Sequence, residues 1–378
     1  MPAERFEIRI PALKLLIAML LTIIPVCFVA LLSITRTDNA LKRTIGSHFR
    51  AVALMSAAQV ADFIHERVME VRDLAISLAV ADAVDAANKK YQGRSDAEID
   101  TAAQRIEETW STLAANPLTS EILSSGASRL LRKYQQFDPQ LLRVTVTDIR
   151  GGVVAATHKP VKYFHADQEF WQSIYASGGG AVSITDVLYD DVTKSNYIGI
   201  GMPILEEGTN RLIGAMEALV EVSANLPILR QVQLGNTGRL MLVKDDGTVV
   251  GAPGVPTGAK MKSDEFAAVR DALGTASGLH TGYIVATLTS GPQLIGFANT
   301  GLKDDYLKLG WVVLAVQDSR EAFASVNTVD RLLAIMSILG IGGVVVFGVY
   351  VSSHRSPSYV DLAEASEPSA TVSRNTVA

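Results

Sequence analysis

The fold is decided by residues 141–157, LLRVTVTDIRGGVVAAT. Residues 141–148 are rich in branched side chains, Arg150-Gly151-Gly152 has the composition of a turn, and VVAAT follows as a second extended run. Branched residues favour strands, and glycine accepts the backbone angles that tight turns need. The stretch therefore predicts an antiparallel hairpin.

The same construction returns further along the chain, at residues 240–250, LMLVKDDGTVV. The repeat continues downstream, because residues 197–204 (YIGIGMPI) and 212–222 (LIGAMEALVEV) correspond to residues 293–300 (QLIGFANT) and 310–318 (GWVVLAVQD). Internal repeats of this length indicate one structural unit that is used twice. Hairpins accompanied by helical segments predict the α+β class, with two similar antiparallel-sheet modules in tandem.

A long helix is predicted before the first module. Apolar residues recur three or four positions apart from Leu41 to Leu78, and no glycine or proline lies between Ser47 and Gly93. This helix either packs on its own domain or forms a parallel seam with a second copy of the chain, and both arrangements can occur together. A second helical pattern runs from Thr101 to about Ala115.

Two uncharged apolar blocks lie near the ends of the chain, at Leu15–Ser33 and Leu332–Val351. Each has about the 20 residues that a helix needs to cross a bilayer. The first exceeds the roughly 7 to 15 residues of a signal-peptide core, so an uncleaved anchor is predicted. Basic residues are almost equally frequent on both sides of the first block, so the positive-inside rule leaves the orientation open.

Composition excludes several classes of function. The single cysteine, Cys27, lies in the first apolar block, so we expect no disulfide, cysteine nucleophile or cysteine metal site in the large domain. A net charge of −5 without a basic run argues against nucleic-acid binding. The six histidines are scattered and no nucleotide-binding motif is present, so neither a metal nor another cofactor is expected.

Three segments together resemble a known family: residues 163–172 (YFHADQEFWQ), 184–204 (ITDVLYDDVTKSNYIGIGMPI) and 211–223 (RLIGAMEALVEVS). They are similar to the membrane-distal half of double Cache domains, which are PAS-like extracytoplasmic sensor modules of bacterial receptors. The second copy of the repeat is similar to the membrane-proximal half of that family.

The resemblance implies a bacterial inner-membrane protein with a periplasmic sensor domain and both termini in the cytoplasm. The expected order is a cytoplasmic N-terminus (1–11), a transmembrane helix (12–34), a double Cache domain (35–326), a second transmembrane helix (332–351) and a disordered cytoplasmic tail (352–378). Within the sensor domain we expect the long helix at 35–88, the distal module at 128–230 and the proximal module at 231–326.

The resemblance also implies a ligand pocket in the distal module. Its aromatic rings would form apolar walls, and its carboxylates would make a few directed polar contacts. Trp171 can wall the pocket or anchor its helix in the core. Glu217 and Glu221 share one face of a predicted strand, which can also be the solvated face. The candidate ligand-binding residues are Tyr163, Asp167, Trp171, Tyr189, Asp191, Tyr197 and Glu217.

One departure from the family bears on the ligand. Amino-acid sensors of this family carry an arginine a few residues after the tyrosine, where this chain has Gln168 and Glu169. Without that guanidinium a carboxylate loses its natural partner. We therefore expect an amine or a neutral polar molecule, with a small carboxylate as the alternative.

The predicted function is a homodimeric small-molecule sensor that signals in trans to a separate cytoplasmic partner, since the polar tail cannot fold into an output domain. A ligand-capturing or scaffolding protein is the first alternative. An extracytoplasmic hydrolase that uses Asp190 and Glu217 as acid and base is the second. No nucleophile motif supports the hydrolase, so the protein is expected not to be an enzyme.

Overall fold

The computed structural model describes residues 12–110, 117–176, 180–190, 194–222, 232, 234–256, 258–274 and 280–353. The chain divides into two compact units, one comprising Thr44–Ala322 and the other Met1–Arg43 with Phe323–Ala378. Helix α1 (Ala12–Ala75) begins in the second of these units, and α11 (Ala324–Ser353) lies in it.

The predicted membrane spans, 12–34 and 332–351, fall within α1 and α11. Among the described residues, no helix combines the length and the apolar character that crossing a bilayer requires. The predicted N-terminal segment 1–11 and all but the first two residues of the predicted tail lie outside the described residues.

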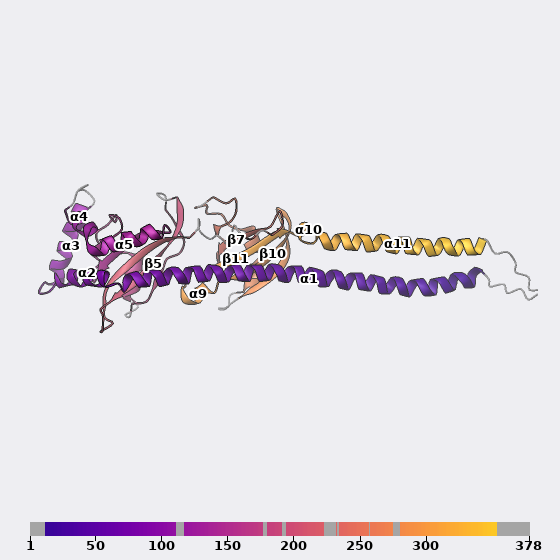
Figure 1. Cartoon of the computed structure of the whole chain (residues 1–378), viewed down its shortest axis with the longest axis horizontal. Coiled ribbons are helices and arrows are strands. Elements are labelled where there is room, and N and C mark those ends of the chain that lie inside the picture. The colour runs from indigo at the N-terminus through magenta and orange to yellow at the C-terminus, as the bar shows by residue number, and fades with distance from the viewer. Residues whose placement is uncertain are drawn as a thin grey trace, which may run out of the picture. The chain divides into compact units, whose positions relative to one another are not determined.

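The unit Thr44–Ala322 contains two antiparallel sheets, as the repeat predicts (Figure 1). The distal sheet has the order β2-β1-β6-β5-β3, with β4 also paired to β5, and the proximal sheet has the matching order β8-β7-β11-β10-β9. The distal strands are β1 (Leu141–Asp148), β2 (Val153–Ala156), β3 (Ser183–Ile184), β4 (Leu188–Asp190), β5 (Ser195–Leu205) and β6 (Leu212–Glu221). The proximal strands are β7 (Arg239–Lys244), β8 (Val249–Gly251), β9 (Thr281–Leu288), β10 (Gly291–Asn299) and β11 (Trp311–Asp318).

An equivalent backbone hydrogen bond occurs in each module, in addition to the common strand order. After the first hairpin, the chain returns along its turn, and the amide of His165 donates to the carbonyl of Gly151 at 2.8 Å. After the second hairpin, the amide of Ser263 donates to the carbonyl of Gly247 at 2.9 Å. Both glycines have positive φ, +90° and +84°, a conformation that other residues adopt at a cost. A helix follows each return segment, α6 (Glu169–Ala176) in the distal module and α8 (Asp264–Leu273) in the proximal one.

The part of α1 that belongs to this unit, residues 44–75, runs along both sheets (Figure 1). Its buried side chains recur three or four residues apart between Phe49 and Ala75, as the sequence pattern predicts. Contact with the proximal sheet is close enough to require glycine, because a Cβ on Gly296 of β10 would lie 2.4 Å from the backbone of Phe49. A Cβ on Gly46 would lie 2.1 Å from the ring of Tyr283.

The prediction of one helix through residue 88 is wrong, because the helix breaks at Ile76-Ser77. Ser77 has extended backbone angles (φ −64°, ψ 136°), and a new helix, α2 (Leu78–Lys89), begins after it. The Ser77 hydroxyl donates to the carbonyl of Leu74 at 2.7 Å and so satisfies an acceptor that the helix end leaves free. Serine competes for backbone groups in this way, which explains a break without glycine or proline.

Three further helices cover the distal module: α3 (Asp96–Trp110), α4 (Pro117–Ser124) and α5 (Gly126–Phe137). The second predicted helix, 101–115, starts earlier than expected, and residues 111–116 lie outside the described residues. Its last described residue, Trp110, is fully buried and donates through Nε1 to the carbonyl of Pro160 at 2.9 Å. Two short helices, α9 (Leu302–Asp305) and α10 (Ser319–Ala322), complete the proximal module.

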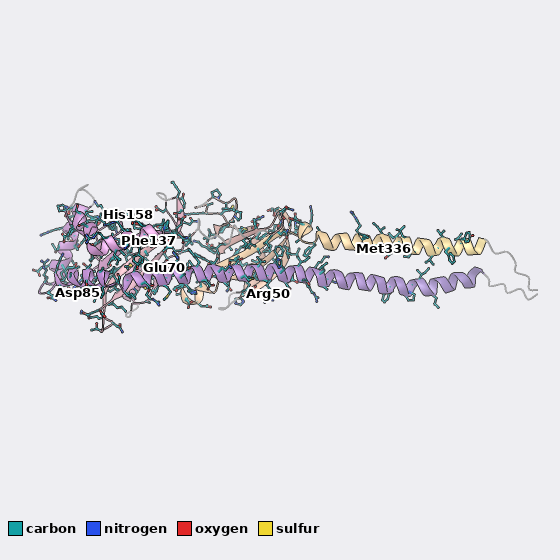
Figure 2. All side chains as sticks on the ribbon, viewed as in Figure 1. Arg50, Glu70, Asp85, Phe137, His158 and Met336 are labelled. Carbon is teal, nitrogen blue, oxygen red and sulfur yellow. The ribbon has the colours of Figure 1, made fainter. Side chains whose placement is uncertain are left out.

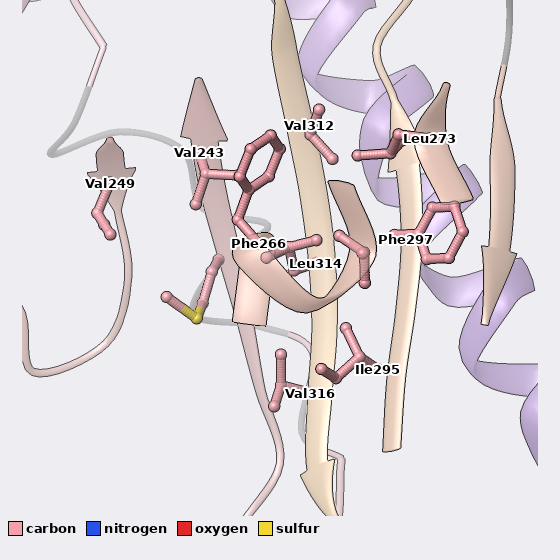
Figure 3. Close-up of a cluster of buried hydrophobic side chains, with 11 residues drawn as sticks. Val243, Val249, Phe266, Leu273, Ile295, Phe297, Val312, Leu314 and Val316 are labelled. Carbon is pink, nitrogen blue, oxygen red and sulfur yellow. The ribbon is translucent and has the colours of Figure 1, made fainter. Parts of the chain in front are cut away.

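The proximal sheet and α8 enclose a closed apolar core (Figure 3). Phe266 and Leu273 of α8 pack on Phe297 of β10 and on Leu314 and Val316 of β11, all of them at most 8% exposed. Such a core contributes about 25 cal/mol for each Å² of apolar surface removed from water. Beneath α8, this face of the proximal module is therefore occupied by its own side chains.

Candidate functional site in the distal module

The equivalent face of the distal sheet carries mainly polar and small residues, where the proximal face carries large apolar ones. Side chains alternate along a strand, so Ala215, Glu217 and Leu219 of β6 lie on one face. The residues in register with them are Thr147, Thr145 and Arg143 on β1 and Pro203, Gly201 and Gly199 on β5. We call this face the floor of the candidate site.

Helix α6 covers one end of the floor. Phe170 and Ile174 form a buried cluster with Ala215. A Cβ on Gly201 would lie 3.2 Å from the Cβ of Phe170, so a larger residue there would push the helix away from the sheet. The helix is thus fixed over β5 and β6 by direct packing.

Trp171 and Tyr175 are the partly buried aromatic residues of α6. Their rings are stacked with centroids 3.8 Å apart and planes inclined by 15°. Trp171 Nε1 and the Tyr175 hydroxyl are both shielded from solvent, and neither has a hydrogen-bond partner among the described residues. A buried polar group without a partner costs about 1–3 kcal/mol. Because two such donors lie on one helix, we expect an acceptor from outside the described residues to bind Trp171 Nε1 and the Tyr175 hydroxyl.

Glu217 stands near the middle of the floor. It makes no hydrogen bond or ion pair with any described residue, and one of its carboxylate oxygens lies 3.3 Å from where a Cβ on Gly199 would be. The Thr185 hydroxyl lies at the same distance from that point and accepts a hydrogen bond from the amide of Gly199 at 2.7 Å. Burial raises the pKa of Glu217 to about 7, and the charge of Arg143 opposes the rise. A half-buried carboxylate without a partner among the described residues, and with a raised pKa, is typical of functional sites.

Tyr197 and Arg143 lie around Glu217 at the other end of the floor. Burial raises the pKa of Tyr197, the charges of Asp190 and Glu217 add to the rise, and Arg143 opposes it. In the sheet Tyr197 is in register with Glu221. The predicted residues Tyr197 and Glu217 therefore come together on one surface.

Tyr163 lies in a buried aromatic and polar cluster. Its ring centroid is 5.4 Å from that of Trp110, and its hydroxyl and an Asp148 carboxylate oxygen each lie 3.0 Å from where a Cβ on Gly152 would be. Asp148 also accepts a hydrogen bond from the Tyr91 hydroxyl at 2.7 Å. Burial raises the pKa of Tyr163, and the charge of Asp148 acts in the same direction. Tyr163 is thus buried and held in its neutral form.

The remaining predicted residues are placed away from the floor or lie outside the described residues. Asp167 is more than half exposed and pairs with Lys162 at 2.5 Å. Tyr189 of β4 is 38% exposed, and its ring atoms lie within 2.9 Å of where a Cβ on Gly258 of the proximal module would be. Asp191 lies outside the described residues.

The structure offers no metal centre among the residues it describes. No group of three potential ligands is found there. His165 is 9% exposed, and its Nε2 lies 3.1 Å from the carbonyl oxygen of Lys162. Burial lowers the pKa of His165, so it is held in its neutral form.

Sequence reasoning missed four residues of this site: Arg143, Thr145, Thr185 and Tyr175. Arg143 and Thr145 share the floor with Glu217 only because of the register between β1 and β6. Tyr175 carries a signal that could have been used, because it follows Trp171 by four residues and such pairs lie on one face of a helix.

The proximal module has a surface groove of about 860 Å³, beside α8 and the connection between β10 and β11. Exposed charges such as Arg270 and Asp271 line it together with apolar residues at the edge of the core, such as Leu273 and Leu309. Its Asp245 is already paired with Lys303 at 2.6 Å, and both side chains are more than half exposed. The unpaired, enclosed groups of the distal floor make that face the stronger candidate for a ligand site.

A long helix followed by two tandem sheets of equal strand order, with a polar face in the distal one, defines a sensor-type ligand-binding domain. The family model for the Cache domain, in its double form, matches residues 37–326. The chain therefore belongs to the Cache family, whose domains are typically non-catalytic ligand-binding modules. A search of curated protein sequences found no match.

Solved structures of sensory domains are similar to this chain at low sequence identity. The sensory domain of the Campylobacter jejuni chemoreceptor Tlp3 matches with a TM-score of 0.50 and 12% identity, covering 76% of this chain and 99% of that one. The ligand-binding domain of the Pseudomonas aeruginosa amino acid chemoreceptor PctC in complex with GABA matches with a TM-score of 0.45 and 15% identity, covering 72% and 99%. That of the Pseudomonas fluorescens chemoreceptor CtaA in complex with L-leucine matches with a TM-score of 0.47 and 12% identity, covering 75% and 99%.

Proposed function

We propose that this protein is a membrane-anchored sensor that binds a small molecule on the distal floor and signals in trans to a cytoplasmic partner. The observation that carries the proposal is Glu217, a half-buried carboxylate with a raised pKa and no partner among the described residues. A folded protein keeps such a group at a cost in stability, and ligand binding is the function that a sensory domain would gain from it.

The favoured ligand carries a cationic nitrogen. An ammonium group would pair with the Glu217 carboxylate, and Tyr197, Tyr163 and Trp171 would supply aromatic surface for it. A neutral polar ligand could instead accept from Trp171 Nε1 and the Tyr175 hydroxyl, which have no described partner. A small carboxylate is the alternative.

Membrane attachment rests on the two apolar blocks of the sequence. Met336 and its apolar neighbours along α11 are exposed (Figure 2). Exposed apolar side chains on a helix favour burial in a bilayer or against a partner. We propose two passes through a bacterial inner membrane, with Thr44–Ala322 in the periplasm, both termini in the cytoplasm and a homodimer formed along α1.

The test is thermal unfolding of the purified full-length chain against amines, amino acids, carboxylates and nucleobases. A ligand at 100 times its dissociation constant adds roughly 2.7 kcal/mol of stability, which is a clear shift of the midpoint. We expect a compound that shifts the wild type and fails to shift Glu217→Gln and Tyr163→Ala. The matched control is Glu207→Gln, an exposed carboxylate at the turn between β5 and β6.

The alternative function, scaffolding without a ligand, predicts no shift with any compound. A shift that persists unchanged in both site variants would place the binding site elsewhere and contradict the proposal.

A further inference from the structure

The distal and proximal modules are joined by side-chain hydrogen bonds. Lys244, the last residue of β7, donates through Nζ to the carboxylate of Asp186 at 2.8 Å. Asn196, near the start of β5, donates through Nδ2 to the carbonyl of Val250 in β8 at 3.1 Å. The β7–β8 hairpin of the proximal module therefore holds the distal module at two points. We call these four residues the module joint.

The module joint is partly shielded from water. The side chain of Lys244 is 19% exposed and that of Asp186 46%, whereas Asn196 is 6% exposed. Beside these residues, a Cβ on Gly258 would lie 2.6 Å from the ring of Tyr189, so the proximal backbone packs directly on β4. Hydrogen bonds and charge pairs are stronger where water is excluded. The joint is thus a packed contact and not only a surface ion pair.

Each distal residue of the module joint is adjacent in the chain to a residue of the candidate site. Thr185 precedes Asp186, and its hydroxyl and the Glu217 carboxylate border the same point of the floor. Tyr197 follows Asn196 and lies on the floor face, because neighbours in a strand point to opposite faces. A shift of Asp186 or Asn196 would therefore move the residues around Glu217.

We propose that Lys244 is a positioning residue for the distal floor. It holds Asp186 and so fixes Thr185 beside Glu217, while the Val250 carbonyl holds the next strand in the same way. The inference rests on the proposed function, since the floor is the proposed ligand site, and it makes that site depend on the proximal module. By linkage, a ligand that shifts Thr185 must also change the strength of the module joint.

The titration of Glu217 reports the geometry of the floor without any ligand. Burial and Arg143 set its pKa, so the charges of Asp186 and Lys244 do not act on it directly. The experiment uses the full-length chain with glutamate labelled by carbon-13 at its carboxyl group, followed by NMR from pH 4 to pH 9. The Glu217 signal is the one that Glu217→Gln removes.

The variants are Lys244→Asp, Asp186→Lys and the double variant, which restores the pair with its charges exchanged. The matched control, Lys303→Asp, breaks an ion pair that stays within the proximal module. We expect each single variant to lower the pKa of Glu217 by about 0.5 or more, a roughly threefold change in proton affinity, because a loosened floor admits water. The double variant should return to the wild-type pKa, and Lys303→Asp should match it throughout.

An unchanged or raised pKa of Glu217 in the single variants would overturn the inference, because the module joint would then be structural only. A lowered pKa that the double variant does not restore would overturn it as well. If Lys244→Asp does not fold, Asp186→Asn at the more exposed partner decides by the same criterion. These results leave the proposed function standing, whereas a wild-type Glu217 that does not titrate near pH 7 would contradict both.

Discussion

Replacing Glu217 with glutamine should make the ligand-free protein more stable at alkaline pH. The folded-state pKa of Glu217 is about 7, whereas an unperturbed glutamate titrates near 4.5. Between these values the folded state holds a proton that the unfolded chain has released, so stability falls as pH rises through this window. Glutamine keeps the shape and has no proton to lose.

The magnitude follows from the pKa difference, at about 1.4 kcal/mol for each unit. The loss of folding stability in the wild type is therefore at most roughly 3 to 4 kcal/mol, almost complete at pH 8 and absent well below pH 4.5. Glu217→Gln should gain up to that amount over the wild type at pH 8 and nothing at pH 4.5.

Ligand affinity should show the opposite dependence on pH, rising as pH rises. A cationic ligand pairs with the ionised carboxylate, which is about 10% populated at pH 6 and about 90% at pH 8. Affinity should therefore rise about tenfold over this range in the wild type and stay flat and weak in Glu217→Gln.

Urea unfolding at pH 4.5, 6, 7 and 8 measures the first effect, and calorimetry at pH 6 and 8 measures the second. Glu207→Gln, which alters an exposed carboxylate, should follow the wild type in both. The reasoning would be refuted if Glu217→Gln were less stable than the wild type at pH 8, because Glu217 would then be a stabilising charge and not a strained one.

Three further substitutions test the packing around the site. Gly296→Ala places a Cβ 2.4 Å from the backbone of Phe49 and should cost more than about 2 kcal/mol by urea unfolding; a change under 0.5 kcal/mol would show that α1 can move off the sheet. Trp110→Phe leaves the Pro160 carbonyl without its donor and should cost about 1–3 kcal/mol, whereas an unchanged midpoint would mean that water replaces the indole. Gly199→Ala narrows the floor, so the free energy of ligand binding should change by more than the free energy of unfolding does. If the free energy of unfolding changes more, Gly199 has a structural role only.

The duplicated architecture could be predicted from the sequence alone. Alternating branched residues around Arg150-Gly151-Gly152 and Asp245-Asp246-Gly247 predicted both hairpins, and the structure has them with the same strand order. These signals are local, because turn chemistry and side-chain alternation act over a few residues. The break at Ser77 was missed because serine occurs both inside helices and at their ends, where it hydrogen-bonds to backbone groups.

The candidate site depended on contacts that the sequence does not encode locally. Glu217 could be assigned to a strand face from its spacing to Glu221, but the pairing of β1 with β6 that brings in Arg143 joins segments far apart in the chain. Asp167 matched a family pattern, yet its neighbour Lys162 holds it at the surface. Tyr189 likewise stands against the proximal module.

The central claim, that the distal floor holds the ligand, is tested most directly by hydrogen exchange of the full-length chain with and without the first stabilising compound. The account predicts slower exchange in α6 and in β6, with β7, β10 and β11 unchanged or affected less. Protection confined to the proximal strands, with α6 and β6 unaltered, would contradict it.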